Sequence, residues 1–549
     1  MRRKWIGVVL CAAAALAQTA ERSSPQPDYR IAGTVIDVST GQTLPGERVS
    51  LGDTKAGSVP DRSVITGPDG SFAFEHLTAG KYQMYAEAVG YPTQGFDQHE
   101  PRFLSAVVVG PGIAADHLAF RLQRGSVISG TISDEFNEPV QHATVHLFRR
   151  GWQSGRFETD HIRSAETDDL GHYKLAQLLP ATYFIAVSAR PWYAREFLTP
   201  AAQTSASSQV IENTKRLDVV FPLTFYSGAS DADSATPIPM QSGERQTADV
   251  VLHSVPAATV RVASSGASQD EKSPRQPPSV YFTQNAFGSE FSPPGQQMRN
   301  GPDGATYSSL APGRYVVHIM DRNGGGKHEE EIDITGDMTI DPDTIGSSAG
   351  ATITGLAKMS DGSPVQHDLT LLLRKKSRHV LSVAPVEIDD KGQFSVENVP
   401  AGTYELDIAG AGDVYLSNMA ARNASVKERL LTVEKPSKVE LGLVIGQGVG
   451  QVHGVALRDA KGVSGVLVLL APEDLNGTSG LFRRDQSDSD GTFTLPRVVP
   501  GKYYVVAIDG AWELEWSKPE VLKRYLAKAT TIDVAANKTY EIKVEVQPK

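Results

Sequence analysis

The feature that most constrains the fold of this chain is a short motif that occurs five times. Its clearest copy runs from Asp69 to Tyr82. Counted from its glycine, apolar or aromatic residues stand at plus two, plus four and plus seven, a small residue at plus ten and a tyrosine at plus twelve. The other copies are Gly171, Tyr173, Leu175, Leu178, Ala181 and Tyr183; Gly392, Phe394, Val396, Val399, Gly402 and Tyr404; Gly491, Phe493, Leu495, Val498, Gly501 and Tyr503; and a degenerate copy, Gly304, Tyr307, Leu310, Gly313 and Tyr315. Such an internal repeat predicts a tandem array of similar structural units.

The motif itself predicts a β-hairpin. Asp-Gly sequences form tight turns, because the aspartate side chain bonds nearby backbone N–H groups and glycine tolerates a positive φ. Phe72 and Phe74 are two residues apart and therefore share one face of the following strand, while Ser71 and Ala73 point the other way. The next small residues reverse the chain. Tyr82 is expected to anchor the returning strand.

The spacing of the motif sets the size of the units. The tyrosines of successive copies lie 101, 132, 89 and 99 residues apart in a chain of 549 residues, so each unit is large enough for a core of its own. Fifty glycines and 33 prolines punctuate many short segments, which is typical of β-sandwiches. We predict an all-β chain of five tandem, seven-stranded, prealbumin-like or immunoglobulin-like sandwiches, with few short helices, one of them within residues 518–526. The expected ranges are 28–123 (unit one), 124–256 (unit two, with an extended tail), 257–345 (unit three, degenerate), 346–447 (unit four) and 448–549 (unit five).

The amino terminus has the pattern of a secretory signal peptide. Basic residues at positions 2–4 precede an apolar run from Trp5 to Leu16 and a small-residue cleavage site, so we predict a signal peptide at residues 1–17. No later segment approaches the roughly 18 unbroken apolar residues of a membrane-spanning helix. The single cysteine, Cys11, lies inside the signal. We therefore expect an exported chain without disulfides or a transmembrane segment, located in the periplasm, at the cell surface or outside the cell.

The charge of the chain argues against nucleic-acid binding. The formal net charge is −11, and loss of the three basic residues of the signal peptide makes it −14. A chain without a basic stripe cannot neutralise a phosphate backbone. We therefore expect no nucleic-acid partner, and we interpret the acidity as an aid to solubility.

The units resemble the bacterial carboxypeptidase regulatory-like domain. The resemblance rests on strands that open with Gly-x-Val or Gly-x-Ile, such as Gly33 to Val35, on a Pro-x-x-x-Val strand such as Pro45 to Val49, and on the Asp-x-x-Gly-x-Phe and Gly-x-Tyr elements of the repeat. That family is transthyretin-like and is similar in fold to starch-binding-like and collagen-adhesin B-type domains. The resemblance covers nearly the whole exported chain, with unit three the weakest copy. It implies a prealbumin-like sandwich and an accessory domain type, with no implied peptidase activity.

Candidate catalytic and metal-binding residues are few. His328 and Glu331 form a His-x-x-Glu pattern that would need a third zinc ligand such as His453, but these histidines belong to different predicted units, so a solvated strand edge is the favoured interpretation. His142 and His146 are about 13 Å apart on a strand and are interpreted as surface residues. The segment from Asp488 to Gly491 resembles part of a calcium loop, but its glycine is the turn glycine of the repeat. We predict no catalytic residue, no metal and no cofactor.

The sharpest candidate for ligand binding is a pair of tryptophans, Trp512 and Trp516. If residues 512–516 form a strand, both indole rings face one side about 13 Å apart and could stack on sugar rings. In the alternative and favoured interpretation, Trp512, Leu514 and Trp516 cover the edge of the sandwich beneath the helix at 518–526.

These observations predict an exported, non-enzymatic binding protein at the cell surface or in the periplasm. Binding of a polysaccharide is the favoured activity, with Trp512 and Trp516 as the platform. The alternative is an adhesive or spacer scaffold that binds a cell-surface protein through sheet edges and loops. A hydrolase or a peptidase accessory chain is the least favoured alternative. A hydrolase would need a catalytic constellation that the sequence does not display. Ligand identity and oligomeric state do not follow from the sequence.

Overall fold

The computed structural model describes residues 28–57, 59–194, 217–263, 279–294, 296–301, 304–320, 327–341, 350–375, 385–434 and 437–549. The predicted signal peptide lies outside these ranges. The described residues form paired β-sheets throughout, which confirms the prediction of an all-β sandwich fold. Within these ranges no helix is long and apolar enough to cross a membrane. We keep the five sequence ranges as a proposed division into domains, and we use the unit names for them below.

Unit one contains two facing sheets. Its strands are β1 (Tyr29–Asp37), β2 (Arg48–Asp53), β3 (Arg62–Ile65), β4 (Ser71–Leu77), β5 (Gly80–Glu87), β6 (Gln94–Gly95), β7 (Val107–Val109) and β8 (Ala115–Leu122), with one 3-10 turn, η1 (Thr54–Ala56). One sheet has the order β4-β1-β8 and the other the order β3-β2-β5-β6, with β7 also pairing with β5. Strand β8 runs parallel to β1, whereas β4 is antiparallel to it. The eight strands, which include the short edge strands β6 and β7, are one more than the seven that we expected.

Unit two repeats this plan with additional short strands. Its strands are β9 (Ser126–Asp134), β10 (Thr144–Gln153), β11 (Arg156–Glu166), β12 (His172–Leu178), β13 (Ala181–Ser188), β14 (Val219–Val220), β15 (Thr224–Phe225), β16 (Ile238–Met240), β17 (Arg245–Thr247), β18 (Val250–Leu252) and β19 (Val255–Pro256). One sheet has the order β12-β9-β17 and the other the order β11-β10-β13-β15. β10 and β11 form a long hairpin with Gly155 in its turn at a φ of 71°.

Units three and four keep the same central order of strands and differ in the strands added at the sheet edges. Unit three has β20 (Ala258–Ala263), β21 (Ser279–Ala286), β22 (Ser289–Phe291), β23 (Gln297–Gly301), β24 (Gly304–Leu310), β25 (Gly313–Met320), β26 (Lys327–Ile334) and β27 (Met338–Ile340). Unit four has β28 (Ala351–Met359), β29 (Leu369–Lys375), β30 (Val386–Ile388), β31 (Gln393–Val399), β32 (Gly402–Ala409), β33 (Val414–Arg422), β34 (Ser425–Lys427), β35 (Leu430–Val433) and β36 (Lys438–Gln447). Their sheets are β23-β24-β20-β27 with β22-β21-β25-β26, and β31-β28-β36-β33 with β30-β29-β32-β35-β34.

Unit five joins its two sheets through the last strand. Its elements are β37 (Gly450–Arg458), β38 (Lys461–Gly462), β39 (Leu467–Pro472), η2 (Ser479–Leu481), β40 (Arg483–Gln486), β41 (Thr492–Val498), β42 (Gly501–Asp509), η3 (Ala511–Glu513), α3 (Pro519–Leu522), η4 (Lys523–Lys528), β43 (Thr530–Val534) and β44 (Thr539–Pro548). β44 is long enough to run parallel to β37 at one end and to β42 at the other. The helical segment predicted within residues 518–526 is confirmed as α3 followed by η4, with Pro519 in the first turn.

The repeated tyrosine has the same hydrogen bond in all five units. Its hydroxyl donates to the backbone carbonyl four residues earlier at 2.7–2.9 Å, from Tyr82 to Thr78, Tyr183 to Leu179, Tyr315 to Ala311, Tyr404 to Pro400 and Tyr503 to Val499. Each tyrosine is buried, with 0–5% of its surface exposed. The bond ties the start of the returning strand to the turn before it, as in the tyrosine corner of immunoglobulin domains. The expectation that Tyr82 anchors the return is confirmed.

The repeated aromatic residue lies opposite a glycine of the first strand. The register pairs Gly33 with Phe72, Gly130 with Tyr173, Gly355 with Phe394 and Gly454 with Phe493. A side-chain carbon on Gly355 would lie 2.1 Å from Phe394 Cζ and 2.3 Å from the Leu441 carbonyl oxygen. The glycine is therefore required by the ring and by the neighbouring parallel strand. In unit three this position is Val260, opposite Tyr307.

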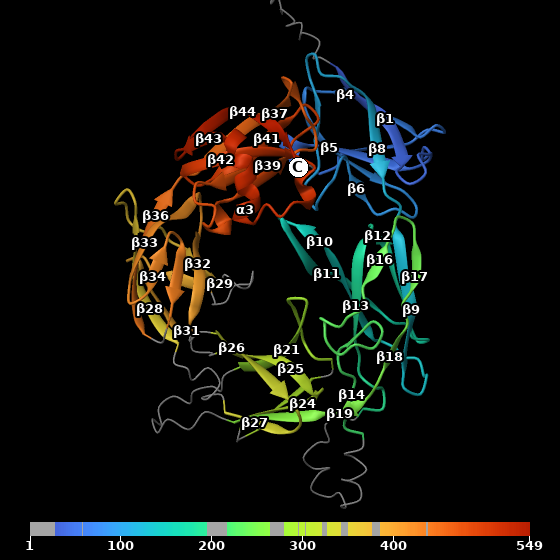
Figure 1. Ribbon diagram of the computed structural model, residues 1–549, viewed down its shortest axis with the longest axis vertical. Helices are drawn as coiled ribbons and strands as arrows, with labels where there is room; N and C mark the ends of the chain where they lie inside the picture. The colour runs from blue at the N-terminus through green and yellow to red at the C-terminus, as the bar shows by residue number, and fades with distance from the viewer. Residues whose placement is uncertain are drawn as a thin grey trace, which may run out of the picture.

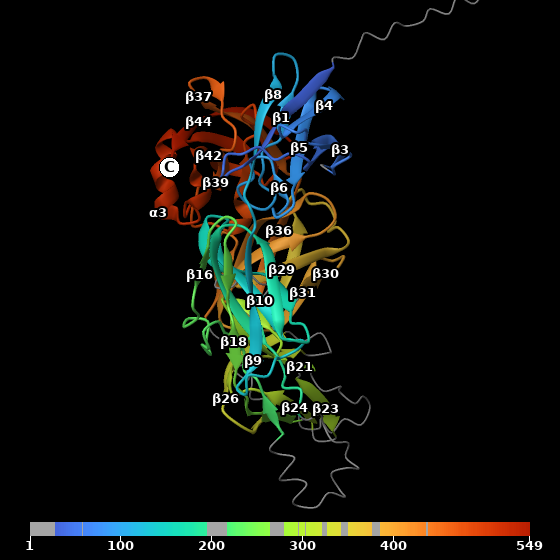
Figure 2. The ribbon, with the colours of Figure 1, turned by 90° about the vertical axis from the view of Figure 1, so that its right-hand side faces the viewer.

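The units are arranged as a closed oval. In Figure 1, unit one (blue) and unit five (red) meet at the upper end, and unit three (yellow-green) lies at the lower end. Figure 2 shows units one and five side by side in the edge-on view as well. Five separate clusters of buried residues lie between the paired sheets, one in each of the five ranges. Two further clusters lie outside these cores. One joins unit two to unit three through Phe148, Phe225 and Phe287, and the other holds Trp512 and Trp516.

Candidate functional site

The tryptophan pair does not form an exposed platform. Trp512 lies in η3 rather than in a strand, and Trp512 and Trp516 are only 6% and 7% exposed. Both pack in a cluster with Leu522 of α3 and with Tyr525 and Leu526. The sugar platform required two exposed rings on one strand, and that prediction is wrong because the chain turns after β42 and folds α3 and η4 over the indoles. The alternative interpretation, packing beneath the helix, is confirmed.

Each indole also contacts another unit. The Trp512 Nε1–H donates to the Gly465 carbonyl oxygen at 3.0 Å, and its ring stacks on His99 of unit one with 5.1 Å between centroids. Trp516 lies against Gly155 in the β10-β11 turn of unit two, where a side-chain carbon would be 2.4 Å from Trp516 Cδ2. Ser517 Oγ donates to the Gly155 carbonyl oxygen at 2.7 Å. The two tryptophans therefore serve contacts between units.

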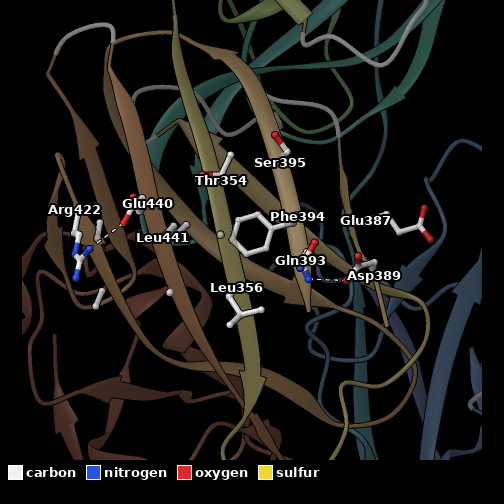
Figure 3. Close-up of a pocket in the computed structure, with 14 residues that line it drawn as sticks. Thr354, Leu356, Glu387, Asp389, Gln393, Phe394, Ser395, Arg422, Glu440 and Leu441 are labelled. Atoms are coloured by element: carbon white, nitrogen blue, oxygen red, sulfur yellow. Dashed lines mark hydrogen bonds and ion pairs between the residues drawn. The ribbon is translucent and has the colours of Figure 1, made fainter. Parts of the chain in front are cut away.

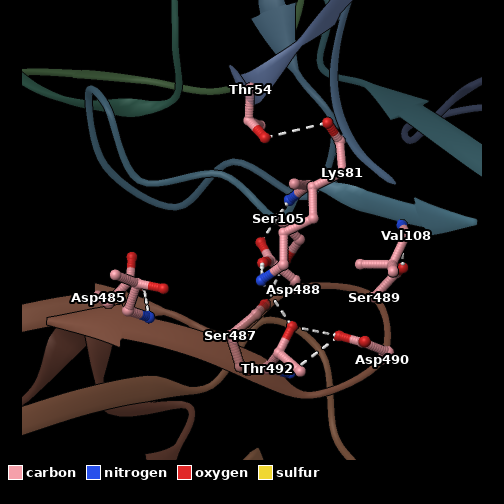
Figure 4. Close-up of polar contacts among 12 residues, drawn as sticks. Thr54, Lys81, Ser105, Val108, Asp485, Ser487, Asp488, Ser489, Asp490 and Thr492 are labelled. Atoms are coloured by element: carbon pink, nitrogen blue, oxygen red, sulfur yellow. Dashed lines mark hydrogen bonds and ion pairs between the residues drawn. The ribbon is translucent and has the colours of Figure 1, made fainter. Parts of the chain in front are cut away.

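An extensive polar contact joins unit five to unit one. We call it the closing contact: Lys81 and residues 97–108 of unit one against residues 464–465, 484–492 and Trp512 of unit five. At its centre, Lys81 Nζ lies 2.6 Å from Asp488 Oδ2 and 2.8 Å from Thr492 Oγ1 (Figure 4). The Ala106 N–H donates to Asp488 Oδ1 at 2.9 Å, and the Val108 N–H donates to Ser489 Oγ at 2.8 Å. One short segment of unit five thus accepts backbone N–H groups in β7 and in the residue before it.

Further bonds extend the closing contact on both sides. Gln486 Nε2 donates to the Asp97 carbonyl oxygen at 2.6 Å and to Ser105 Oγ at 2.8 Å. Ser105, which is 0% exposed, donates in turn to the Ser487 carbonyl oxygen at 2.9 Å. Protein interfaces of standard size carry about ten direct hydrogen bonds. The closing contact is therefore an extensive interface between segments that lie 381–411 residues apart in the chain.

Arg484 joins three units at one point. Its guanidinium is 2.7 Å from Glu100 Oε2 of unit one and donates to Ser154 Oγ of unit two at 2.9 Å. It also lies over the Phe103 ring, 4.1 Å from its centroid. The side chains of Arg484 and Glu100 are 17% and 6% exposed, so this ion pair is shielded from solvent screening.

Two carboxylates of the closing contact, Asp485 and Asp488, have raised pKa values. Removal from water raises the pKa of Asp485 to about 7. The backbone N–H groups of Gln486 and Thr494 donate to this carboxylate and act in the opposite direction, towards a lower pKa. Removal from water also raises the pKa of Asp488, while the Lys81 ammonium acts in the opposite direction. Asp485 lies to one side of the Lys81–Asp488 pair in Figure 4. Shifted carboxylates are typical of functional sites as well as of structural ion-pair networks.

A signal for the role of Asp488 is present in the sequence, although we did not recognise it. In units two and four, Asp168 and Asp389 stand three residues before the turn glycine and accept the backbone N–H groups of the turn. In unit one this is done by Asp69, directly before the glycine. Unit five has both aspartates, and Asp490 accepts the Thr492 N–H at 3.0 Å. The duplicated aspartate leaves Asp488 available to bind unit one.

An open depression lies on the surface of unit four. It has a volume of about 1170 Å³ and lies over the sheet β31-β28-β36-β33. Its lining includes the ring of Phe394 and seven side chains that can form hydrogen bonds (Figure 3): Thr354, Glu387, Asp389, Gln393, Ser395, Arg422 and Glu440. Arg422 and Glu440 pair with each other at 3.3 Å. We call this surface the unit-four trough.

The remaining candidates do not come together. His328 lies in β26 and His453 in β37, and among the described residues no group of three or more His, Cys, Asp or Glu side chains could hold a metal ion. The segment from Asp488 to Gly491 is a turn, with a φ of 84° at Gly491. His142 is exposed and pairs with Glu166.

His146 is not a surface residue, contrary to our interpretation. It is 9% exposed and its two ring nitrogens bond Ser164 Oγ and Ser188 Oγ at 3.0 and 2.8 Å. Its ring also contacts Phe291 of unit three, with 4.6 Å between centroids. Removal from water lowers the pKa of His146 to about 4, so the ring is neutral in the folded protein at neutral pH.

Comparison with known families and structures identifies two domains. Residues 30–122 match the carboxypeptidase regulatory-like domain, which confirms the resemblance for unit one, and residues 447–532 match the second β-sandwich domain of a BOS complex subunit NOMO1-like family. No curated protein matches the chain.

The solved structures that match the chain include two pilins and a further bacterial protein. The shaft pilin SpaA from Lactobacillus rhamnosus GG is 9% identical, over 41% of this chain and 98% of that chain, with a TM-score of 0.19. The Bacillus anthracis TIE protein is 9% identical, over 96% and 76%, with a TM-score of 0.15. The minor pilin GBS52 of Streptococcus agalactiae is 11% identical, over 42% and 97%, with a TM-score of 0.20. Similarity at this level does not identify a function.

Proposed function

We propose that this chain is an exported, non-enzymatic binding scaffold that acts at the cell surface or in the periplasm. The observation that carries the proposal is the closing contact, in which Lys81 and Asp488 join the first unit to the last. A tandem array that is held at both ends keeps its sheet faces and loops at fixed relative positions. An array of this kind can bind one cell-surface protein at several points. After the first point is bound, binding at the second point is intramolecular and is therefore favoured.

The energetics support a structural role for the closing contact. Surface ion pairs contribute about 0–1 kcal/mol each, and a single one would not hold two units together. Here the Asp488 side chain is 14% exposed and its oxygens also accept the Ala106 N–H, while Ser105 and Gln486 are buried between the units. Loss of one partner leaves buried polar groups unpaired, which costs about 1–3 kcal/mol for each group.

The proposal is tested by crosslinking in cells that produce the chain. A protein partner that is crosslinked to the native chain and lost with Lys81→Glu, but kept with the exposed control Lys502→Glu, supports a scaffold that needs closure. Metal-dependent turnover of a substrate by the purified chain would contradict a non-enzymatic role.

Carbohydrate binding is a second candidate, and the unit-four trough is the observation that favours it. Its amide, hydroxyl, guanidinium and carboxylate groups offer both donors and acceptors to sugar hydroxyls. Retention on a panel of polysaccharides should then be lost with Gln393→Ala and Thr354→Ala. The matched control Lys358→Ala lies on β28 and is exposed outside the trough. No retention on any glycan would remove this candidate and leave the scaffold proposal intact.

A further inference from the structure

The two sides of the closing contact belong to units with separate cores. The core of unit one includes Phe72 and Phe120, the core of unit five includes Phe493 and Val505, and the two clusters share no residue. No strand pairing crosses the contact among the described residues. One backbone bond crosses it, from the Ser489 N–H to the Ala106 carbonyl oxygen at 2.9 Å. The contact can therefore open without disruption of either sandwich.

Opening would uncover a strand edge on unit one. On one side, β7 pairs with β5, and on its other side its neighbours are Asp488 and Ser489. Without unit five, the N–H groups of Ala106 and Val108 would lose these acceptors. Unpaired backbone groups along an edge strand are a template for association with another chain. Ser105 and Glu100, which are 0% and 6% exposed, would be uncovered with them.

The surface that best complements this edge is present on every copy of the chain. Lys81 and Glu100 of unit one face Asp488 and Arg484 of unit five, so the charges alternate in sign across the contact. The unit-one surface and the unit-five surface of the closing contact lie near opposite ends of one chain, and they differ from each other. A contact of this heterologous kind can close within one molecule or join successive molecules head to tail.

We propose that the closing contact also joins copies of this chain, with unit five of one copy docked on unit one of a second copy. Two such contacts close a reciprocal dimer. The contact within one molecule prevails at low concentration, because the tether gives the two surfaces a high effective concentration, and exchange between copies grows as the protein concentration rises. This inference goes beyond the proposed scaffold role, since it names a second copy as a partner.

Charge reversal across the Lys81–Asp488 pair provides the test. Lys81→Glu places two carboxylates in contact, and Asp488→Lys places two ammonium groups in contact, so neither variant can form the contact within itself or with its own copies. A mixture of the two variants can form a reciprocal dimer, because each unit one then faces a unit five of opposite charge. The double variant Lys81→Glu with Asp488→Lys can close within one molecule.

The molecular mass of each species is measured by light scattering after size-exclusion chromatography. We expect each single variant to be monomeric, the double variant to be monomeric at low concentration, and an equimolar mixture of the single variants to show a species of twice the monomer mass. Circular dichroism of each variant checks that its sandwiches are folded. A mixture that stays monomeric at high concentration would overturn the proposal. So would dimers that form equally in each single variant alone.

Discussion

The five repeated tyrosine bonds lead to a prediction that can be tested within unit five. Tyr503 is 4% exposed and donates to the Val499 carbonyl oxygen at 2.7 Å, and Val499 itself is 8% exposed. Tyr503→Phe removes the hydroxyl and leaves this buried acceptor without its donor. Loss of one partner of a buried bond costs about 1–3 kcal/mol. Because the aromatic ring is kept and no large cavity forms, we expect a loss of about 1–2 kcal/mol in the free energy of unfolding.

The neighbouring Tyr504 is a matched control. It stands next to Tyr503 in β42, points to the opposite face and is half-buried. Tyr504→Phe removes the same atom and should change the free energy of unfolding by less than about 0.5 kcal/mol. Urea unfolding followed by tryptophan fluorescence detects this unit through Trp512 and Trp516, which are both buried in it. Trp152 and Trp192 of unit two add a signal that both variants share.

Equal effects of the two substitutions would contradict the reasoning, since only Tyr503 has the repeated bond. A Tyr503→Phe substitution that leaves the free energy of unfolding unchanged would show that the turn before β42 keeps its conformation without the hydroxyl. In that case the tyrosine in each unit would act through the packing of its ring alone.

Three further predictions concern unit five and its contacts. Gly454→Ala should destabilise the unit by about 1–3 kcal/mol in the same urea experiment, because the added methyl would lie 2.4 Å from Phe493 Cζ. The pKa of Asp485 is raised in the folded state to about 7, so the folded protein holds a proton that the unfolded chain releases. The unfolding free energy should therefore decrease as the pH rises from about 4 to about 7, and Asp485→Asn should remove this dependence in urea titrations at several pH values. Gly155→Val should displace the turn from Trp516 and shift tryptophan fluorescence to longer wavelength, whereas no shift would contradict the contact.

The sequence predicts the local structure of each unit well, because the residues that determine the turn, the buried strand face and the tyrosine bond all belong to the motif. A turn needs glycine at a positive φ, and Gly70, Gly171, Gly392 and Gly491 have φ values of 73–84°. Alternation of apolar residues defines the buried face of the following strand, and the tyrosine finds its acceptor four residues away. All of these interactions lie within a few residues along the chain, so spacing alone is sufficient to identify them.

The candidate site could not be predicted in the same way because it depends on contacts between units. The chemistry of Trp512 permits either sugar stacking or burial. Its burial depends on α3 and η4 of its own unit and also on His99 and Phe103 of unit one, which pack on it. The role of Asp488 depends on Lys81, which is 407 residues away. No periodicity relates such positions. The duplicated aspartate before Gly491 was the one local sign that this turn differs from the others.

The central claim is that the first and last units of one molecule are in contact, and zero-length crosslinking tests it directly. Carbodiimide joins an amine and a carboxylate only where they touch, and Lys81 Nζ lies 2.6 Å from Asp488 Oδ2. The pairs Lys518–Glu515 at 2.6 Å and Lys427–Asp474 at 3.4 Å serve as reactivity controls. In the monomeric fraction of a dilute sample, mass spectrometry should find an amide between Lys81 and Asp488. Crosslinks at both control pairs without one at Lys81 would contradict the closed arrangement.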